Sequence, residues 1–359
     1  MARLLDIDGM LSEIKQQPHA LRDTIEKNRS IIKQIGLNLS NKVKNGEIDN
    51  VVIIARGSSD NAAALGKYII ETTLGIPVSL AAPSVINLYK ASLNLTKSLV
   101  IGVSQSGKTN EVVDFMTQVK EVSGFSISIT NDRNSSLAHL GLSADLFCNV
   151  GVEKAVAATK SFSATLIIFY LIAAAMSGDL DENIDKLMMI PELIEQTIDT
   201  AEEEICNISC WLGSYDECII LARGFNYPIA LEASLKLQEC SYIRAKAYSG
   251  ADFQHGPMAI TRKGLPFIFF MADGPSYEGS KWLCQSLLEK GGDILVFSPN
   301  MELDLKNKGA KVITIPQSPE YLSPYIFCVS AQLLTFYSAI AKGINPNEPH
   351  WLNKITNTI

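Results

Sequence analysis

The stretch VVIIARGSSDNAA at residues 51–63 and the stretch CIILARGFNYPIA at residues 218–230 decide the fold of this chain. Each opens with an apolar run and then reaches Ala-Arg-Gly, a change that predicts a strand followed by a loop. Ala and Leu then recur at helical spacing over residues 62–74, so a helix follows the first loop. Because Ala-Arg-Gly begins at Ala55 and begins again at Ala222, one unit is expected to occur twice.

Three further pairs of apolar strands repeat at nearly the interval that separates Ala55 from Ala222. They are 98–103 with 266–271, 125–130 with 293–298, and 145–150 with 311–316. Helical segments such as 110–121 separate the strands, and a short strand is also predicted at 77–80. This alternation is typical of a parallel sheet with helices on both faces. We therefore predict an α/β fold with two tandem, doubly wound parallel-sheet domains.

The chain as a whole is predicted to have five parts. They are a helical N-terminal segment (1–34), a first domain (35–178), a helical connector broken near Pro191 (179–212), a second domain (213–342) and an irregular tail (343–359). The connector is rich in Glu, Asp, Leu and Ile at helical spacing, and the tail loses this periodicity.

Composition excludes several classes of protein. The 31 Lys and Arg against 38 Asp and Glu give a net charge of −7, so we expect no nucleic-acid binding. Asp6, Asp8 and Glu13 interrupt the N-terminus, which therefore lacks the apolar core of a signal peptide. The most apolar stretch, 166–176, is shorter than the roughly 20 residues that a membrane span needs, and we expect it to be a buried core helix. These features predict a cytoplasmic protein with no membrane partner.

The seven cysteines are scattered, with no CxxC pair and no flanking His at metal-ligand spacing. We expect free or buried thiols in a reducing compartment and no metal site. Cys206 and Cys210 lie one helical turn apart, and we expect them to contribute to packing rather than to chemistry.

The loop Gly57-Ser58-Ser59 follows the first predicted strand. Ligands of open α/β sheets bind at the carboxyl ends of the strands, where the start of a helix offers free N–H groups to an anion. The alternative is that Ser59 or Asp60 only caps the helix.

The loop at residues 104–109 carries a stronger signal. Ser104, Gln105, Ser106 and Thr109 supply hydroxyl and amide groups, and a glycine between them lets the backbone approach an oxyanion. Such a set suits a phosphate monoester. Residues 102–109 also fit the phosphate loop of nucleotide triphosphatases, G-x-x-x-x-G-K-[ST]. Because Gly102 falls inside the predicted strand rather than at the start of the loop, a magnesium-dependent nucleotide hydrolase is the less favoured alternative.

The segment 231–255 holds a third set of polar residues. Lys236 and Glu239 are three residues apart, so a helix places them on one face. A surface ion pair is the simplest interpretation, but the flanking residues are mostly apolar and indicate a buried helix, where charges need a purpose. His255 precedes Gly-Pro in a predicted turn. A Lys, a Glu and a His near a phosphate loop suit proton transfer on a sugar phosphate.

Together these segments resemble the SIS (sugar isomerase) family, and most closely the isomerase half of glucosamine-6-phosphate synthase and the stand-alone glucosamine-6-phosphate deaminases. The resemblance covers nearly the whole chain. Besides the two loops, it rests on EIKQQPHALRDTI (13–25), VAATKSF (156–162), ALEASLKLQE (230–239), QHGPMAI (254–260) and EPHWLNKITNTI (348–359). It implies two SIS domains of the flavodoxin-like doubly wound type and a tail that closes over the site.

The resemblance also implies roles for individual residues. The sugar 6-phosphate would be held by Ser104, Gln105, Ser106 and Thr109, and the sugar would be lined by Gly57, Ser58, Ser59, Val156 and Ala158. Glu239 would move the proton between C1 and C2, with Lys236 near it or near the phosphate. His255 would assist ring opening from the neighbouring subunit of a homodimer. Lys354 in the tail would reach over the site. No cofactor and no metal are implied.

Two departures from the synthases bear on the reaction. Lys108 stands where the synthases usually have Glu, and Ala158 stands where they usually have Ser, which removes one hydroxyl from the sugar site. The chain also shows no glutaminase domain with a nucleophilic cysteine, so we expect no glutamine-dependent synthesis.

The resulting expectation is a glucosamine-6-phosphate deaminase that releases ammonia and fructose 6-phosphate. Alternatives are a deglycase of 6-phosphorylated fructose-amino acids and a phosphosugar isomerase that releases no nitrogen. From a different class, the chain could be a non-catalytic sugar-phosphate sensor, but Glu239, His255 and Lys354 argue against that.

Overall fold

The structure is a computed structural model that describes residues 9–354. The first eight residues of the predicted N-terminal segment and the last five of the predicted tail lie outside it. The described chain divides into two compact units. The first unit consists of residues 17–153, 160–191 and 353–354, and the second of residues 9–16, 154–159 and 192–352.

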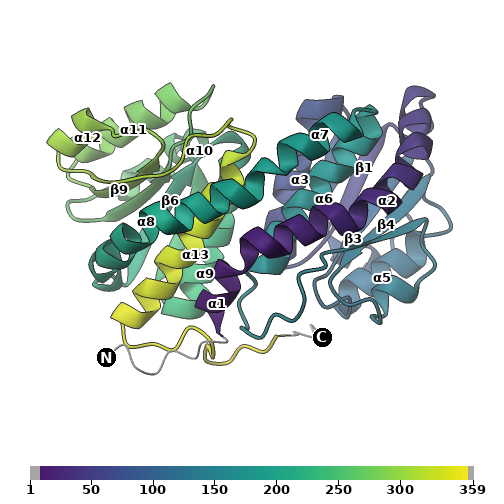
Figure 1. The fold of residues 1–359 in the computed structure, drawn as a ribbon, viewed down its shortest axis with the longest axis horizontal. Coiled ribbons are helices and arrows are strands. Elements are labelled where there is room, and N and C mark those ends of the chain that lie inside the picture. Colours follow the sequence, from purple (N-terminus) through teal and green to yellow (C-terminus); the bar gives the residue numbers. More distant parts are fainter. Residues whose placement is uncertain (1–8, 355–359) are drawn as a thin grey trace. The chain divides into compact units, whose positions relative to one another are not determined.

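The first unit is built on a parallel five-stranded sheet in the order β2-β1-β3-β4-β5. The strands are β1 (Asn50–Ile54), β2 (Val78–Leu80), β3 (Ser98–Val103), β4 (Phe125–Thr130) and β5 (Ala144–Phe147). The helices are α2 (Gln17–Lys44), α3 (Ser58–Leu74), α4 (Pro83–Asn87), α5 (Asn110–Val119), η1 (Leu137–His139), α6 (Lys160–Ser177) and α7 (Leu180–Leu187). Helix α6 packs against α2 and α3, whereas α5 packs with α4 on the other face of the sheet (Figure 1).

The second unit repeats this sheet, in the order β10-β9-β8-β6-β7. Its strands are β6 (Glu217–Ala222), β7 (Arg244–Ser249), β8 (Pro266–Phe270), β9 (Asp293–Ser298) and β10 (Lys311–Thr314). Its helices are α1 (Met10–Lys15), α8 (Met189–Gly213), η2 (Gly224–Asn226), α9 (Tyr227–Ser241), α10 (Gly250–Gln254), η3 (Pro257–Ile260), α11 (Tyr277–Glu289), α12 (Leu303–Asn307) and α13 (Ser323–Ala341). The tail after α13 is irregular up to residue 354.

The strand registers confirm the predicted duplication. Ile53 lies opposite Ile101 in the first sheet, and Ile220 lies opposite Ile268 in the second. The number of residues from Ile53 to Ile220 equals that from Ile101 to Ile268, so two strands that pair in the first sheet recur as a pair in the second. Read from β7, the second sheet has the same strand order as the first. The predicted α/β class, with two tandem doubly wound domains and an irregular tail, is therefore confirmed.

Two local predictions differ from the structure. Strand β7 was not predicted, because it is an edge strand in which exposed Arg244 and Lys246 alternate with buried alanines. The connector breaks near Pro191, at Met188 between α7 and α8, but the proline does not cause the break. Pro191 lies in the first turn of α8, where its missing N–H costs no helical hydrogen bond.

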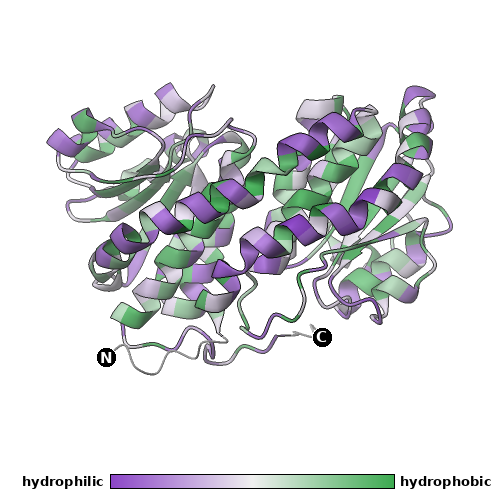
Figure 2. Cartoon of the chain, viewed as in Figure 1, coloured by the Kyte–Doolittle hydropathy of each residue, from purple (hydrophilic) through white to green (hydrophobic). Residues whose placement is uncertain are grey.

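The predicted core helix at residues 166–176 is part of α6, and its counterpart in the second unit is α13. Both helices are long and apolar enough to cross a membrane by length and composition, but 89% of the apolar window of α6 and 83% of that of α13 are buried inside the protein. Figure 2 shows the hydrophobic character of both helices. They are the central core helices of their units.

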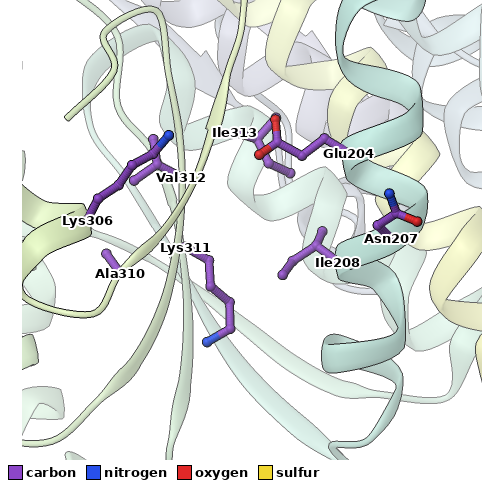
Figure 3. A pocket seen from close by; sticks show the side chains of 8 residues that line it. All are labelled: Glu204, Asn207, Ile208, Lys306, Ala310, Lys311, Val312 and Ile313. Carbon is purple, nitrogen blue, oxygen red and sulfur yellow. The ribbon is translucent and has the colours of Figure 1, made fainter. Parts of the chain in front are cut away.

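The last strands of the two sheets have different surroundings. In the first unit, the Asn28 side chain of α2 pairs with the backbone of Phe147 in β5: its Nδ2 donates to the carbonyl at 2.7 Å, and its Oδ1 accepts from the amide at 3.2 Å. In the second unit, β10 borders a cavity of about 480 Å³. Figure 3 shows its walls, with Glu204, Asn207 and Ile208 on α8 and Lys306 and Lys311 on the opposite side. None of the predicted site residues lines this cavity.

Candidate active site

The predicted phosphate loop connects β3 to α5 in the first unit. Ser104 is buried directly after β3, and its hydroxyl lies 2.9 Å from that of Thr109, the residue before α5. The Lys108 amide donates to the Ser106 hydroxyl at 3.2 Å. The hydroxyls of the loop therefore lie at the N-terminus of α5, where backbone N–H groups and the helix dipole favour an anion.

The loop is fixed in place before any ligand arrives. Gly107 has φ +61°, and its amide donates to the Ser104 carbonyl at 3.0 Å. A Cβ at Gly107 would lie 2.0 Å from the Ser135 hydroxyl, so no other residue fits there without a shift. The Gln105 carbonyl accepts from the Asn131 amide at 2.9 Å. Such a preorganised cradle binds an anion without the entropic cost of ordering the loop.

A cavity of about 530 Å³ opens onto this loop. It is lined by Lys27, Gln105, Ser106, Lys108, Asn131, Asp132, Arg133, Asn149, Gly151, Val152, Glu153 and Lys354. Four of these residues are cations and two are carboxylates. Lys108 lies 3.4 Å from Asp132, whose pKa is lowered by the hydrogen bond from the Asn134 amide and by Lys108. The cavity is thus positively charged on balance and suits a small anion.

The structure brings Lys354 of the tail into this cavity. Its Nζ lies 3.0 Å from Oε2 of Glu153, which is buried. Glu153 also accepts hydrogen bonds from the Ser161 amide at 3.1 Å and the Ser161 hydroxyl at 2.7 Å. Glu153 was not among the predicted site residues. In the sequence, Glu153 stands out only as an acidic residue in the largely apolar segment before VAATKSF.

In the loop after β1, neither Ser59 nor Asp60 caps the following helix, α3. Gly57 is the N-cap residue of α3, with φ +57°, and no side chain caps the helix. Ser58 and Ser59 are half-buried in its first turn. Burial raises the pKa of the Asp60 carboxyl, with Arg56 opposing. The interpretation of Ser59 or Asp60 as an N-cap is therefore wrong, and the free N–H groups of this helix start stay available to a ligand.

Lys236 lies inside the second unit, on α9. It is 2% exposed, its Nζ contacts Oε2 of Glu239, and it lies 3.5 Å from Oε1 of Glu232. Burial lowers the pKa of the Lys236 ammonium, but the charges of Glu232 and Glu239 outweigh burial and raise it overall. The predicted pairing on a mostly buried helix is confirmed: the Lys236 side chain is enclosed, and that of Glu239 is 23% exposed. The interpretation as a surface ion pair is wrong. Glu232, which completes the cluster, was not predicted.

Glu239 opens onto a cavity of about 420 Å³ in the second unit, lined by Gln238, Glu239, Tyr242, His350, Trp351 and Leu352. Tyr242 ends α9 with φ +54°, and its hydroxyl accepts a hydrogen bond from the His350 amide at 2.8 Å. The two rings lie 5.4 Å apart. Trp351 is 98% exposed. The carboxylate thus faces a largely apolar and aromatic surface.

The remaining predicted residues lie elsewhere in the second unit. His255 is exposed at the end of α10, beside Gly256 with φ +120°. Val156 and Ala158 are half-buried in the segment 154–159. The structure therefore groups Lys354 with the phosphate loop and Lys236 with Glu239.

Two features weigh against nucleotide hydrolysis. Gly102 lies inside β3, where a Cβ would come within 2.6 Å of Met116, so the glycine is needed for packing. Lys108 is exposed and pairs with Asp132 at the surface. Within residues 9–354, no group of three or more His, Cys, Asp or Glu side chains could hold a metal ion.

All seven cysteines are free thiols, and five of them are buried. Burial raises the pKa of Cys148, Cys218 and Cys284 to about 12. Cys206 and Cys210 are exposed on α8, so the expectation that they contribute to packing is wrong. They lie on the side of the helix that faces away from the core.

Comparison with known proteins identifies the family. The SIS domain family model matches residues 47–175 and 214–342. The chain is 34% identical over 96% of its length to a glutamine–fructose-6-phosphate aminotransferase of Gloeobacter violaceus, and 31% identical over 96% to that of Aquifex aeolicus. It spans 58% and 57% of the length of these relatives.

Two solved structures match nearly end to end. The C-terminal domain of glucosamine-fructose-6-phosphate aminotransferase from Francisella tularensis is 26% identical, with a TM-score of 0.82, over 95% of this chain and 98% of that one. A glucosamine-6-phosphate deaminase from Thermotoga maritima is 25% identical, with a TM-score of 0.73, over 94% of this chain and 100% of that one. With two copies of the domain matched over most of its length, the chain belongs to the SIS domain family.

Proposed function

We propose that this protein is a sugar-phosphate enzyme, and specifically a glucosamine-6-phosphate deaminase in the cytoplasm. One observation carries the proposal: the fixed loop of Ser104, Ser106 and Thr109 opens onto a cationic cavity that also holds Lys354. A phosphate monoester has the charge and the oxygen acceptors that such a cradle requires.

The proposed reaction consumes glucosamine 6-phosphate and water and yields fructose 6-phosphate and ammonia. His255 assists opening of the ring. Glu239 removes the proton from C2, which the neighbouring aldehyde acidifies, and delivers it to C1. The resulting ketimine at C2 is hydrolysed by water, which supplies the new carbonyl oxygen while the amine leaves. Lys236 holds Glu239 in place and balances its charge.

The comparisons support this class of substrate. The matched structures include one named for a glucosamine-6-phosphate deaminase and one named for the C-terminal domain of a glucosamine-fructose-6-phosphate aminotransferase. The former matches this chain with a TM-score of 0.73 at 25% identity. In the proposed deaminase reaction the substrate itself supplies the nitrogen.

A second candidate is a deglycase of 6-phosphorylated fructose-amino acids. The cavity beside Glu239 favours it, because Tyr242, Trp351 and Leu352 offer apolar surface to a substituent on the amine. Free ammonia as a leaving group makes no use of such a surface.

The test is release of ammonia and fructose 6-phosphate from glucosamine 6-phosphate by the purified protein without glutamine. Equal amounts of both products are expected, and Glu239→Gln is expected to lose at least about 10²-fold in kcat. The matched control is Glu121→Gln, which changes an exposed carboxylate just after α5 and should keep wild-type activity.

Three other substrates and readouts separate the alternatives. Release of an amino acid from its 6-phosphorylated fructose adduct, with no ammonia from glucosamine 6-phosphate, would establish the deglycase. Interconversion of glucose 6-phosphate and fructose 6-phosphate would establish an isomerase. A rise in melting temperature with glucosamine 6-phosphate, without turnover of any of these compounds, would support the sensor.

A further inference from the structure

The duplication relates each residue of the phosphate loop to a residue of the second unit. The interval that separates Ile53 from Ile220 in the strand registers also separates Gly57 from Gly224, Gly107 from Gly274 and Thr109 from Ser276. All four glycines have positive φ, at +57° and +60° for the first pair and +61° and +131° for the second. The second unit therefore keeps a glycine with positive φ at both positions, and a hydroxyl residue before the helix, although the backbone at Gly274 differs from that at Gly107.

In the second unit, the space between these residues holds a carboxylate of the protein itself. The Ser276 hydroxyl donates to Oε1 of Glu320 at 2.7 Å. If Gly224 carried a Cβ, that atom would lie 3.5 Å from the same oxygen. A Cβ on Gly274 would lie only 2.6 Å from the other carboxylate oxygen of Glu320, Oε2. Glycine at position 274 is thus what admits the carboxylate.

Glu320 is held firmly in this place. Its carbonyl accepts from the Ser323 hydroxyl at 2.7 Å, and that hydroxyl lies 3.1 Å from Oδ1 of Asn226. At the same interval, the residue of the first unit that corresponds to Glu320 is Glu153. Its carboxylate turns instead to Ser161 and Lys354, which leaves the loop 104–109 open to the cavity.

A cation accompanies the second cradle. The Arg223 guanidinium lies beside the first turn of α11, since a Cβ added to Gly279 in that turn would be 3.4 Å from Nη1 of Arg223. Its counterpart Arg56 is engaged by Glu111 through two hydrogen bonds, of 2.7 and 2.9 Å. Among the described residues, no carboxylate lies within ion-pair distance of Arg223, so its guanidinium can serve an anion.

We propose that the second unit contains an anion site that Glu320 occupies as an internal ligand, and that a phosphate group takes this site when the carboxylate is removed. The phosphate class rests on the function proposed for the first loop. In the wild-type protein Glu320 therefore limits each chain to one phosphate site, although the fold provides two cradles.

The experiment counts inorganic phosphate bound per chain by equilibrium dialysis of the full-length protein. We expect one site in the wild type and two in Glu320→Ala. Glu289→Ala is the matched control, because it removes an exposed carboxylate from the last turn of α11, at the end of the helix away from the cradle. It should bind one phosphate.

A folded Glu320→Ala protein that binds no more phosphate than the wild type would overturn the proposal. If that variant does not fold, Glu320→Ser keeps a hydroxyl next to Ser276 and is expected to gain the same site. Adding Arg223→Ala should weaken the gained site at least about tenfold, as loss of a charged hydrogen bond does. No site in the wild type but one in Glu320→Ala would refute the phosphate role of the first loop and still support this inference.

Discussion

At the scale of single residues, Lys236 is a fully enclosed ammonium between two carboxylates, Glu232 and Glu239. Replacing it by Met removes the positive charge that both carboxylates face. Since an uncompensated buried charge is costly, we expect Lys236→Met to lose about 3–5 kcal/mol of unfolding free energy in urea.

The double variant Glu232→Gln, Lys236→Met tests this reason. Removing one carboxylate together with the ammonium should recover more than half of the lost stability, since less charge stays buried without a partner. Activity should stay low in both variants, because Glu239 has lost the group that positions it. A double variant as unstable as Lys236→Met would show that packing of the lysine chain, and not charge, is what matters.

The thiols offer a second prediction at this scale. Cys206 and Cys210 are exposed, whereas the other five are buried, and burial keeps the Cys148 pKa at about 12. A thiol reagent at pH 8 should therefore modify two cysteines per native chain and all seven in denaturant. Rapid modification of more than two in the native protein would contradict the burial of the others.

Some of these residues could be predicted from the sequence, and others could not. The spacing of Lys236 and Glu239 and their apolar flanks were enough to predict that the two residues pair and that their helix is mostly buried. Glu232 and Glu153 were missed because each gains its meaning from a partner that only the folded chain brings near, Lys236 one turn away and Lys354 in the tail. Glu320 shows the same limit, since nothing local marks it as the occupant of a loop 44 residues earlier.

At the scale of elements, Asn28 of α2 takes the place of a neighbouring strand for β5. Asn28→Ala would leave the Phe147 amide without its partner, whereas the Phe147 carbonyl would keep the hydrogen bond from the Asn149 side chain at 2.8 Å. We expect a loss of about 2 kcal/mol in unfolding free energy, because buried backbone groups cost about 1–3 kcal/mol when unpaired. Asn41→Ala, on the exposed side of the same helix, should change stability by less than about 0.5 kcal/mol. Equal effects of the two variants would contradict this role.

Asp293 at the start of β9 joins three elements. Its carboxylate accepts from Trp211 and Tyr215, both at 2.7 Å, and pairs with Lys311 of β10 at 2.5 Å. Burial alone raises the pKa of Asp293, but Lys311, Trp211 and Tyr215 outweigh it, so the pKa is lowered overall.

A carboxyl with a lowered pKa stabilises the fold above its ordinary pKa of about 3.9, and this contribution is lost as the pH falls through the folded value. We therefore expect Asp293→Asn to be less stable than the wild type at pH 7, and the gap to narrow below about pH 4. Urea unfolding at both pH values measures it. A gap independent of pH would assign the effect to hydrogen-bond geometry alone.

Most elements could be predicted from periodicity, because buried parallel strands are continuous apolar runs. Strand β7 could not, since its exposed face carries Arg244 and Lys246, and only pairing with β6 identifies it as a strand. The break in the connector was predicted near its place but for the wrong reason, because Pro191 lies in the first turn of α8, where a helix accepts a proline.

At the scale of the whole molecule, the duplication was readable in the sequence because almost the same interval recurs between the members of every pair of strands. The sequence does not show, however, that the first cradle is open to a cavity while Glu320 fills the second. Gly-rich loops at corresponding positions look alike in sequence, and whether a distant glutamate fills one of them depends on the course of the chain between β10 and α13.

Assembly can be tested at the same scale. We propose that the protein is a homodimer in which His255 acts on the site of the partner subunit. Glu239→Gln and His255→Ala should then each be inactive as homodimers, and coexpression should restore about a quarter of wild-type activity, since half of the dimers would be mixed and each would hold one intact site. Size-exclusion chromatography with light scattering gives the mass. Mixed dimers without any recovery would place both residues in one subunit.

The open side of β10 has a consequence for self-association. A strand at the margin of a sheet can recruit the same strand from another molecule, a route to ordered aggregates. Here the strand has only four residues, and charged side chains of both signs border it, Lys306 and Lys311 on one side of the cavity and Glu204 on α8. A second strand that paired with β10 would have to desolvate these charges, and only four residues of backbone would gain hydrogen bonds in return. The short length of the strand and the charges beside it therefore protect this margin against aggregation.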